Sequence, residues 1–111
     1  MANALEAHGV PEAMEAVSQA LAEARLNRAV PGAIRDHDMA LVEQALATFY
    51  GRLTRAYLEI AEQWASRDEL YQAQRMVEQA KDCVKAVDVA TSEYRRLMRK
   101  SGSKPTPEAA H

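Results

Sequence analysis

The stretch Trp64-Ala-Ser-Arg-Asp-Glu-Leu70, "WASRDEL", decides the fold because it lies within a long run that contains neither proline nor glycine. Ser66 followed three residues later by Glu69 has the spacing of a capping box, which begins a helix. The apolar spacing also changes phase here, since Trp64 to Leu70 is a step of six, whereas one face of a helix recurs every three or four residues. We therefore predict a corner at this stretch, where two long helices join in an antiparallel hairpin.

The segment before the corner has the spacing of one long helix over residues 37–65. Either Asp36 or Asp38 is expected to cap its N-terminus. Gly51 lies inside the run and costs about 1 kcal/mol relative to alanine in a helix interior. We predict a continuous helix with a weak point at Gly51. Its apolar residues recur in steps of three or four: Val42, Leu46, Phe49, Leu53, Tyr57, Ile60 and Trp64.

The segment after the corner, residues 68–100, has the most regular apolar spacing in the chain. Its heptad seam consists of Leu70, Ala73, Val77, Ala80, Val84, Val87, Thr91, Tyr94 and Met98. A flanking row, each member one residue before a seam position, consists of Met76, Cys83, Ala90 and Leu97. A two-stranded coiled coil does not need this second row, so the widened apolar face predicts a bundle of three or more helices.

A further helix is predicted over residues 11–29, because Pro11 suits the first turn and "VPG" at 30–32 ends the pattern. Residues 1–10 are expected to form an N-terminal arm, with a short helical turn that ends at Gly9. Residues 101–111 have the composition of a flexible tail. The predicted fold class is all-α: a three-helix bundle over residues 11–100, built on a long antiparallel hairpin with coiled-coil-like packing.

The composition fits one soluble domain. The chain has 111 residues, of which 48% are hydrophobic and 27% charged, and its formal net charge is -2. This balance gives no general attraction to nucleic acid or to an anionic membrane. The single cysteine excludes an internal disulfide, and we expect neither a secretion signal nor a membrane span. The expected location is the cytoplasm.

We find no constellation of residues that would carry catalysis. The three acidic and histidine residues at 36–38 point in different directions on a helix, so capping explains them better than a metal does. Glu59 and Glu62 lack the Glu-x-x-His pairs of metal-binding bundles. Cys83 is expected to be a packing residue. Phosphate-binding loops and nucleophile elbows are absent. We therefore expect no enzyme activity, no metal and no cofactor.

The end of the 68–100 helix carries a local excess of positive charge at Arg95, Arg96, Arg99 and Lys100. Cations at a helix C-terminus interact favourably with the helix dipole, which is the simpler interpretation. The alternative is a docking patch for an acidic protein or for a phosphate backbone.

One segment resembles a degenerate tetratricopeptide repeat. Its residues are Tyr57-x-x-Ile60-Ala61-x-x-Trp64 followed by Ala73-x-x-x-Val77-x-x-Ala80. The resemblance implies that "ASRDEL" is the turn between two helices and that the preceding helix could end at Gly51. Lys85 stands where the repeat would close with proline, and no second copy is present. The resemblance supports the corner and covers about a quarter of the chain.

A chain with no chemical site and a long apolar face is expected to act by binding protein. The first hypothesis is a structural or assembly component that associates with itself. The alternatives are an adaptor or chaperone that holds a partner helix, as the repeat-like segment implies, and a nucleic-acid-associated protein that uses the basic helix end. The residues expected to make buried contacts with a partner are Phe49, Trp64, Met76, Cys83, Ala90 and Leu97.

Overall fold

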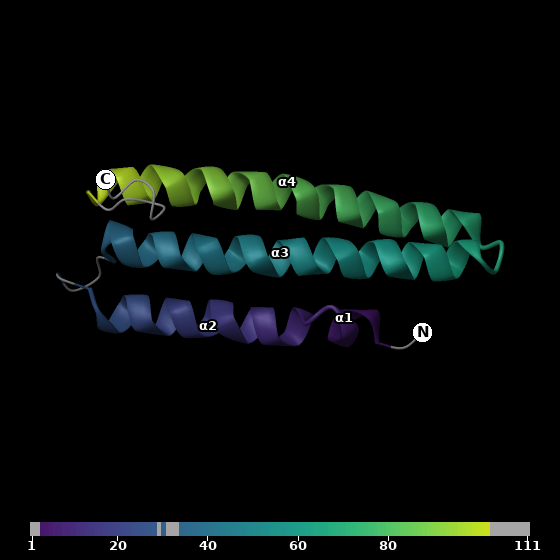
Figure 1. Cartoon of the computed structure of the whole chain (residues 1–111), viewed down its shortest axis with the longest axis horizontal. Helices are drawn as coiled ribbons and strands as arrows, with labels where there is room; N and C mark the ends of the chain where they lie inside the picture. Colours follow the sequence, from purple (N-terminus) through teal and green to yellow (C-terminus); the bar gives the residue numbers. More distant parts are fainter. Residues whose placement is uncertain (1–2, 29, 31–33, 103–111) are drawn as a thin grey trace, which may run out of the picture.

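The structure is a computed structural model that describes residues 3–28, 30 and 34–102. The secondary-structure elements within these residues are the helices α1 (Ala4–Ala7), α2 (Val10–Leu26), α3 (Asp36–Ala65) and α4 (Leu70–Lys100). The helices α3 and α4 run antiparallel along almost their whole length (Figure 1). The prediction of an all-α fold built on a long antiparallel hairpin is therefore confirmed. The predicted tail lies largely outside the described residues.

The three long helices lie in one layer with α3 in the middle (Figure 1). The helix α3 packs against α4 on one side and against α1 and α2 on the other, and no contact joins α2 to α4 among the described residues. The molecule is elongated, with extents of 54 × 29 × 21 Å. The bundle is thus open, because the central helix is covered along two flanks while its two remaining faces have no helix over them.

The corner forms at the predicted stretch. Backbone hydrogen bonds that close the end of α3 stabilise it, and no side chain caps the start of α4. Asp68 is left-handed, with φ 59°. The amide of Glu69 donates to the Trp64 carbonyl, and the amide of Asp68 donates to the Ala65 carbonyl, both at 3.0 Å. These two bonds define a Schellman motif, which satisfies the last carbonyls of a helix.

The predicted capping box is wrong. The Ser66 hydroxyl donates to the Gln63 carbonyl at 2.7 Å, within the last turn of α3, and α4 has no side-chain cap. The predicted N-caps of α3 are also wrong, because Arg35 precedes the helix and no side chain caps it. Asp36 and Asp38 lie in the first turn instead, where negative charge is favourable to the helix dipole.

We expect Asp68→Gly to raise the free energy of unfolding by about 0.5 to 1 kcal/mol, because glycine adopts the left-handed conformation without the clash that a Cβ brings. A urea melt with a higher midpoint and an unchanged slope would show this. Arg67→Gly is the matched control, since Arg67 does not have a positive φ, and this change should lower stability. If Asp68→Gly also lowers stability, the Schellman account of the corner fails.

The helix α3 is continuous through Gly51, as predicted. The implication of the repeat resemblance that a helix ends there is wrong. A Cβ added at Gly51 would meet no atom within 4 Å, so the glycine is not required by any close contact within the chain.

We expect Gly51→Ala to stabilise the protein by about 0.5 to 1 kcal/mol, because alanine loses less backbone entropy than glycine in a helix interior. Thermal or urea unfolding at a fixed protein concentration measures the change. A loss of stability would contradict the assignment of open space around Gly51.

The junction between α1 and α2 is held against the middle of α3. Gly9 is left-handed, with φ 72°, and its carbonyl accepts a hydrogen bond of 3.0 Å from Arg52 Nη1. One residue earlier, His8 Nε2 lies 2.9 Å from Glu59 Oε1. A Cβ at Gly9 would come within 2.9 Å of Arg52 Nη1. Glycine is therefore favoured here by the left-handed backbone, and the Arg52 guanidinium would have to shift to make room for a larger residue.

The core is divided between the two flanks of α3 and is rich in alanine. On the α2 side, Ala56 is fully buried together with Ala4 and Val10. On the α4 side, Ala40 is fully buried together with Leu97 and Met98. Small side chains at these positions allow helices to approach closely.

The face of α4 that packs on α3 is rotated from the predicted heptad seam toward the flanking row. The flanking row is the better buried of the two, since Cys83, Ala90 and Leu97 are all buried. Two predicted seam residues are exposed instead, Leu70 at 66% and Val84 at 48%. The pattern correctly identified the apolar half of α4, but the centre of its contact with α3 lies between the two rows.

Candidate interaction surfaces

The described part of the chain contains no group of three His, Cys, Asp or Glu residues that could hold a metal ion. Cys83 is buried. Burial and then the negative charge of Asp82 raise the pKa of the Cys83 thiol, so that little reactive thiolate forms at neutral pH. Within the described ranges, no helix is both long and apolar enough to cross a membrane. The features that can be assigned are surfaces.

One apolar surface feature is a strip on the middle helix, which we call the α3 strip. Its members recur in steps of three, four and seven, so they lie on one face of the helix. Each is half-buried. The α3 strip consists of Met39, Leu46, Tyr50, Leu53, Tyr57 and Trp64.

The α3 strip lies on one open face of α3, with α2 along one flank of this helix and α4 along the other. At one edge, Leu53 packs against the core cluster shared with α1 and α2. At the other, Met39 packs against the cluster shared with α4. Because no contact joins α2 to α4 in the described residues, the remaining surface of these side chains stays uncovered. Side chains of the strip thus contact both core clusters, and no helix of the described residues covers their outer surface.

A small hollow adjoins the strip on the α2 side. It has a volume of about 100 Å³ and is lined by Met14 and Val17 of α2 and by Leu46 and Phe49 of α3. Met14 is 55% exposed, which is a large fraction for an apolar side chain beside a core. The hollow extends the apolar character of the strip across the α2–α3 boundary.

Two ring contacts order aromatic side chains of the strip. The rings of Phe49 and Tyr50 meet edge to face, with centroids 5.1 Å apart. The guanidinium carbon of Arg67 lies 5.9 Å from the centroid of the Trp64 ring, within the range of a cation–π interaction. These contacts restrict the rings before any partner binds, which lowers the entropy lost on binding.

The ends of the hairpin differ in charge. Near the start of α3, Glu43 and Glu93 lie across the hairpin from each other, and burial followed by the charge of Glu93 raises the pKa of Glu43. Near the corner, Arg67 and Arg75 are exposed and form no ion pair within the described residues. Glu43 and Glu93 thus lie near one end of the strip, and Arg67 and Arg75 lie near the other.

A second apolar feature, the hairpin groove, lies between α3 and α4 close to the corner. It has a volume of about 420 Å³ and is lined by Leu58, Ala61, Glu62, Ala65, Ala73 and Val77. Leu58 is 43% exposed. The groove falls within the repeat-like segment. Leu58 and Glu62 point between about 100° and 160° away from Tyr57 and Trp64 around α3, so the groove lies on the other face of the hairpin from the strip.

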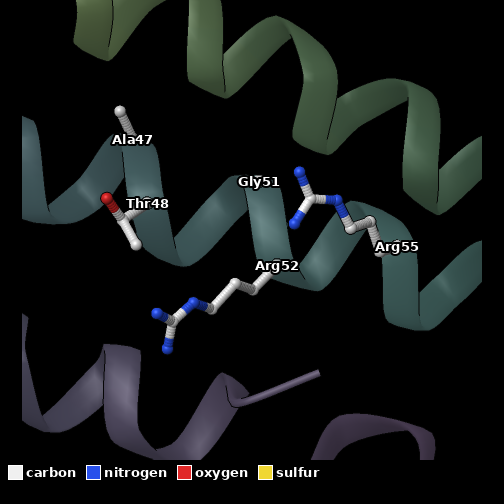
Figure 2. A pocket seen from close by; sticks show the side chains of 5 residues that line it. All are labelled: Ala47, Thr48, Gly51, Arg52 and Arg55. Carbon is white, nitrogen blue, oxygen red and sulfur yellow. The ribbon is translucent and has the colours of Figure 1, made fainter. Parts of the chain in front are cut away.

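A polar hollow of about 430 Å³ lies over the middle of α3 and is lined by Ala47, Thr48, Gly51, Arg52 and Arg55 (Figure 2). The two arginines diverge, since Arg52 extends toward α2 and Arg55 toward α4. Arg52 already donates to the Gly9 carbonyl. Because the guanidinium groups do not converge on one point, the hollow is poorly suited to hold a single anion.

The partner-binding residues predicted from the sequence divide into two groups. Cys83, Ala90 and Leu97 are buried within the hairpin itself, so a partner could reach them only if α3 and α4 separated. Phe49, Trp64 and Met76 are half-buried, and Trp64 belongs to the α3 strip. The structure does not gather the six residues into one surface.

The predicted basic patch is partly neutralised within the chain. Arg96 forms an ion pair with Glu93, and this hydrogen bond lowers the pKa of Glu93. Lys100 Nζ lies 3.9 Å from Asp36 Oδ2. Arg95 and Arg99 are exposed and form no ion pair with the described residues. Two of the four cations are thus left for a partner.

Met39 and Tyr50 were not predicted as site residues, and Leu46, Leu53 and Tyr57 were predicted only as members of the apolar spacing of residues 37–65. A signal for the α3 strip was present in the spacing, because Tyr50, Tyr57 and Trp64 follow one another at seven residues, and so do Met39, Leu46 and Leu53. Comparison with known protein families, curated proteins and solved structures finds no match for this chain.

Proposed function

We propose that the protein is a non-enzymatic helical assembly component that associates with itself. The observation that carries the proposal is the α3 strip, in which three aromatic and three aliphatic side chains of the central helix are only half-buried. Large contiguous apolar patches are rare on monomeric soluble proteins and typically mark interaction sites.

The chemistry of the strip supports a protein partner over a small molecule. Tyrosine and tryptophan are enriched among residues that dominate binding energy between proteins, because they bury a large area with few rotatable bonds. The strip is long and spread along a helix, whereas small-molecule sites are concave and enclosed.

The mass of the purified protein in solution, measured by light scattering after gel filtration, tests the proposal. We expect a mass of at least two chains at high micromolar concentration, because burial of the strip would stabilise the complex. A mass of 12.3 kDa, that of one chain, at every concentration up to the high micromolar range would contradict self-association.

The hairpin groove supports a second candidate, an adaptor that holds a partner helix. Its lining is almost entirely apolar, with small side chains at Ala61, Ala65 and Ala73 that would admit a helix closely. This candidate predicts a protein that is monomeric alone and forms a one-to-one complex with a single partner. Val77→Glu should abolish that complex, while Tyr57→Lys should leave it intact.

The basic end of α4 gives less support to nucleic acid as the partner, because the net charge is -2 and two of its four cations are paired within the chain. If the protein causes no gel shift even at low salt, nucleic acid is not the partner. The proposed location is the cytoplasm, which the single buried cysteine supports.

A further inference from the structure

We propose that the partner of the α3 strip is a second copy of this chain, which packs face to face with the two α3 helices antiparallel about a two-fold axis near residues 51 and 52. This inference rests on the proposed self-association and adds the surface and the orientation. A two-fold contact requires a self-complementary surface, in which residue i meets residue j and j meets i.

The order of side chains along the strip is self-complementary in the antiparallel orientation. The six positions pair symmetrically about the same midpoint: Met39 with Trp64, Leu46 with Tyr57, and Tyr50 with Leu53. Every pair joins one aliphatic side chain to one aromatic side chain. Alternating large and smaller side chains across facing positions lets two layers interdigitate. A parallel, in-register pairing would instead place Tyr50, Tyr57 and Trp64 against their own copies.

The charges at the rim agree with the same orientation. The α3–α4 hairpin brings Asp36 beside Lys100 and Glu43 opposite Glu93, which fixes the α4 residues that flank the strip. Reversal about the strip's midpoint then brings Arg75 of one copy to within about one residue of Glu93 of the other. Arg75 and Glu93 carry opposite charges, so the antiparallel reversal places one complementary pair at each of the two symmetric positions on the rim.

The face of the three-helix layer that carries the strip has nearly the area that one partner buries in a standard interface. From Met39 to Trp64 the strip is about 38 Å long at 1.5 Å per residue. Two helix spacings of 8–10 Å make the layer about 18 Å wide. The product is roughly 700 Å² for each copy, close to the roughly 800 Å² that each partner buries in a standard specific interface.

Site-directed cross-linking distinguishes the orientation. In a Cys83→Ala background, which removes the only natural cysteine, we compare Leu46→Cys and Tyr57→Cys as single variants and as an equimolar mixture, using a short bifunctional maleimide. The mixture should give a two-chain product. Each variant alone should give none above background, because identical positions would lie about 16 Å apart along the helix.

Thr48→Cys mixed with Arg55→Cys is the matched control. These two residues have the same midpoint but line the polar hollow on the opposite face of α3, so they should not cross-link. A second pair, Arg75→Cys with Glu93→Cys, leaves the strip intact and should also cross-link. This pair decides the outcome if either strip variant proves monomeric by light scattering. Circular dichroism confirms that each variant remains helical.

Cross-linking of Leu46→Cys or Tyr57→Cys with itself would show a parallel pairing and overturn the inference. Cross-linking of the Thr48 and Arg55 pair without the Leu46 and Tyr57 pair would place the contact on the other face and would also overturn it. Both results leave self-association standing. A monomeric mass for the parent protein would instead contradict the proposed function itself.

Discussion

Replacing Tyr57 with lysine is expected to convert the self-associated protein into a monomer. Tyr57 is half-buried at the open face of α3, where we expect the aromatic ring to pack on Leu46 of the second copy. Loss of an aromatic interface anchor commonly costs about 2 kcal/mol or more. A two-fold dimer contains the change twice, so the dissociation constant should rise roughly 1000-fold. Light-scattering mass measured over a dilution series gives the constant.

Thr48→Lys is the matched control for Tyr57→Lys. It introduces the same charge on the same helix, but at an exposed position on the opposite face. We expect Thr48→Lys to leave the dissociation constant within about threefold of the wild-type value, because isolated surface substitutions usually change little. The account is contradicted if Thr48→Lys dissociates the protein while Tyr57→Lys does not.

Leu97→Ala is expected to lower the free energy of unfolding by about 2 to 4 kcal/mol, because truncating a buried leucine loses its transfer energy and leaves a cavity. Leu97 is 6% exposed and packs with Ala40 and Met98 where α4 meets the start of α3. Ala40 is small and has no side chain that could rotate to fill the space. Urea unfolding, followed by circular dichroism at one fixed protein concentration, measures the change.

Val89→Ala is the control for Leu97→Ala. Val89 lies on the same helix and is 68% exposed, so its truncation should change stability by less than about 0.5 kcal/mol. Equal effects from the two substitutions would contradict the packing of α4 on α3. A small effect at Leu97 alone would show that the cluster around Ala40 does not contribute to the hairpin.

The corner could be predicted from sequence because two independent signals met at one place. The phase slip between Trp64 and Leu70 follows from the direction in which each helix buries its apolar face, and it located the turn correctly. The capping signal gave the wrong mechanism. The same residues can end one helix or begin the next, and here the left-handed Asp68 closes α3 through backbone hydrogen bonds, which leave little trace in the sequence.

The α3 strip could not be predicted with the same success, because an apolar pattern shows that a face is buried but not what buries it. Leu46, Leu53 and Tyr57 have the spacing of core residues, and in a closed bundle they would be interior. They are only half-buried here because α2 packs on the flank of α3 opposite α4 and does not reach across. Which side of α3 receives α2 depends on tertiary packing, and the apolar spacing of α2 does not predict it.

The centre of the α4 seam illustrates the same limit at finer scale. Val84 and Cys83 are adjacent, and both continue apolar columns with a spacing of seven. Only the packing against α3 determines that Cys83 is buried while Val84 remains 48% exposed. A pattern with two adjacent apolar columns therefore predicts which half of the helix is apolar, but not which column contacts the neighbouring helix.

Sedimentation equilibrium of the unmodified protein, from low to high micromolar concentration, tests the central claim most directly. The claim is that the open face of α3 is covered by another copy of the chain. We predict a mass that rises with concentration to about twice the 12.3 kDa of one chain. A mass that stays at 12.3 kDa throughout the range would contradict the account.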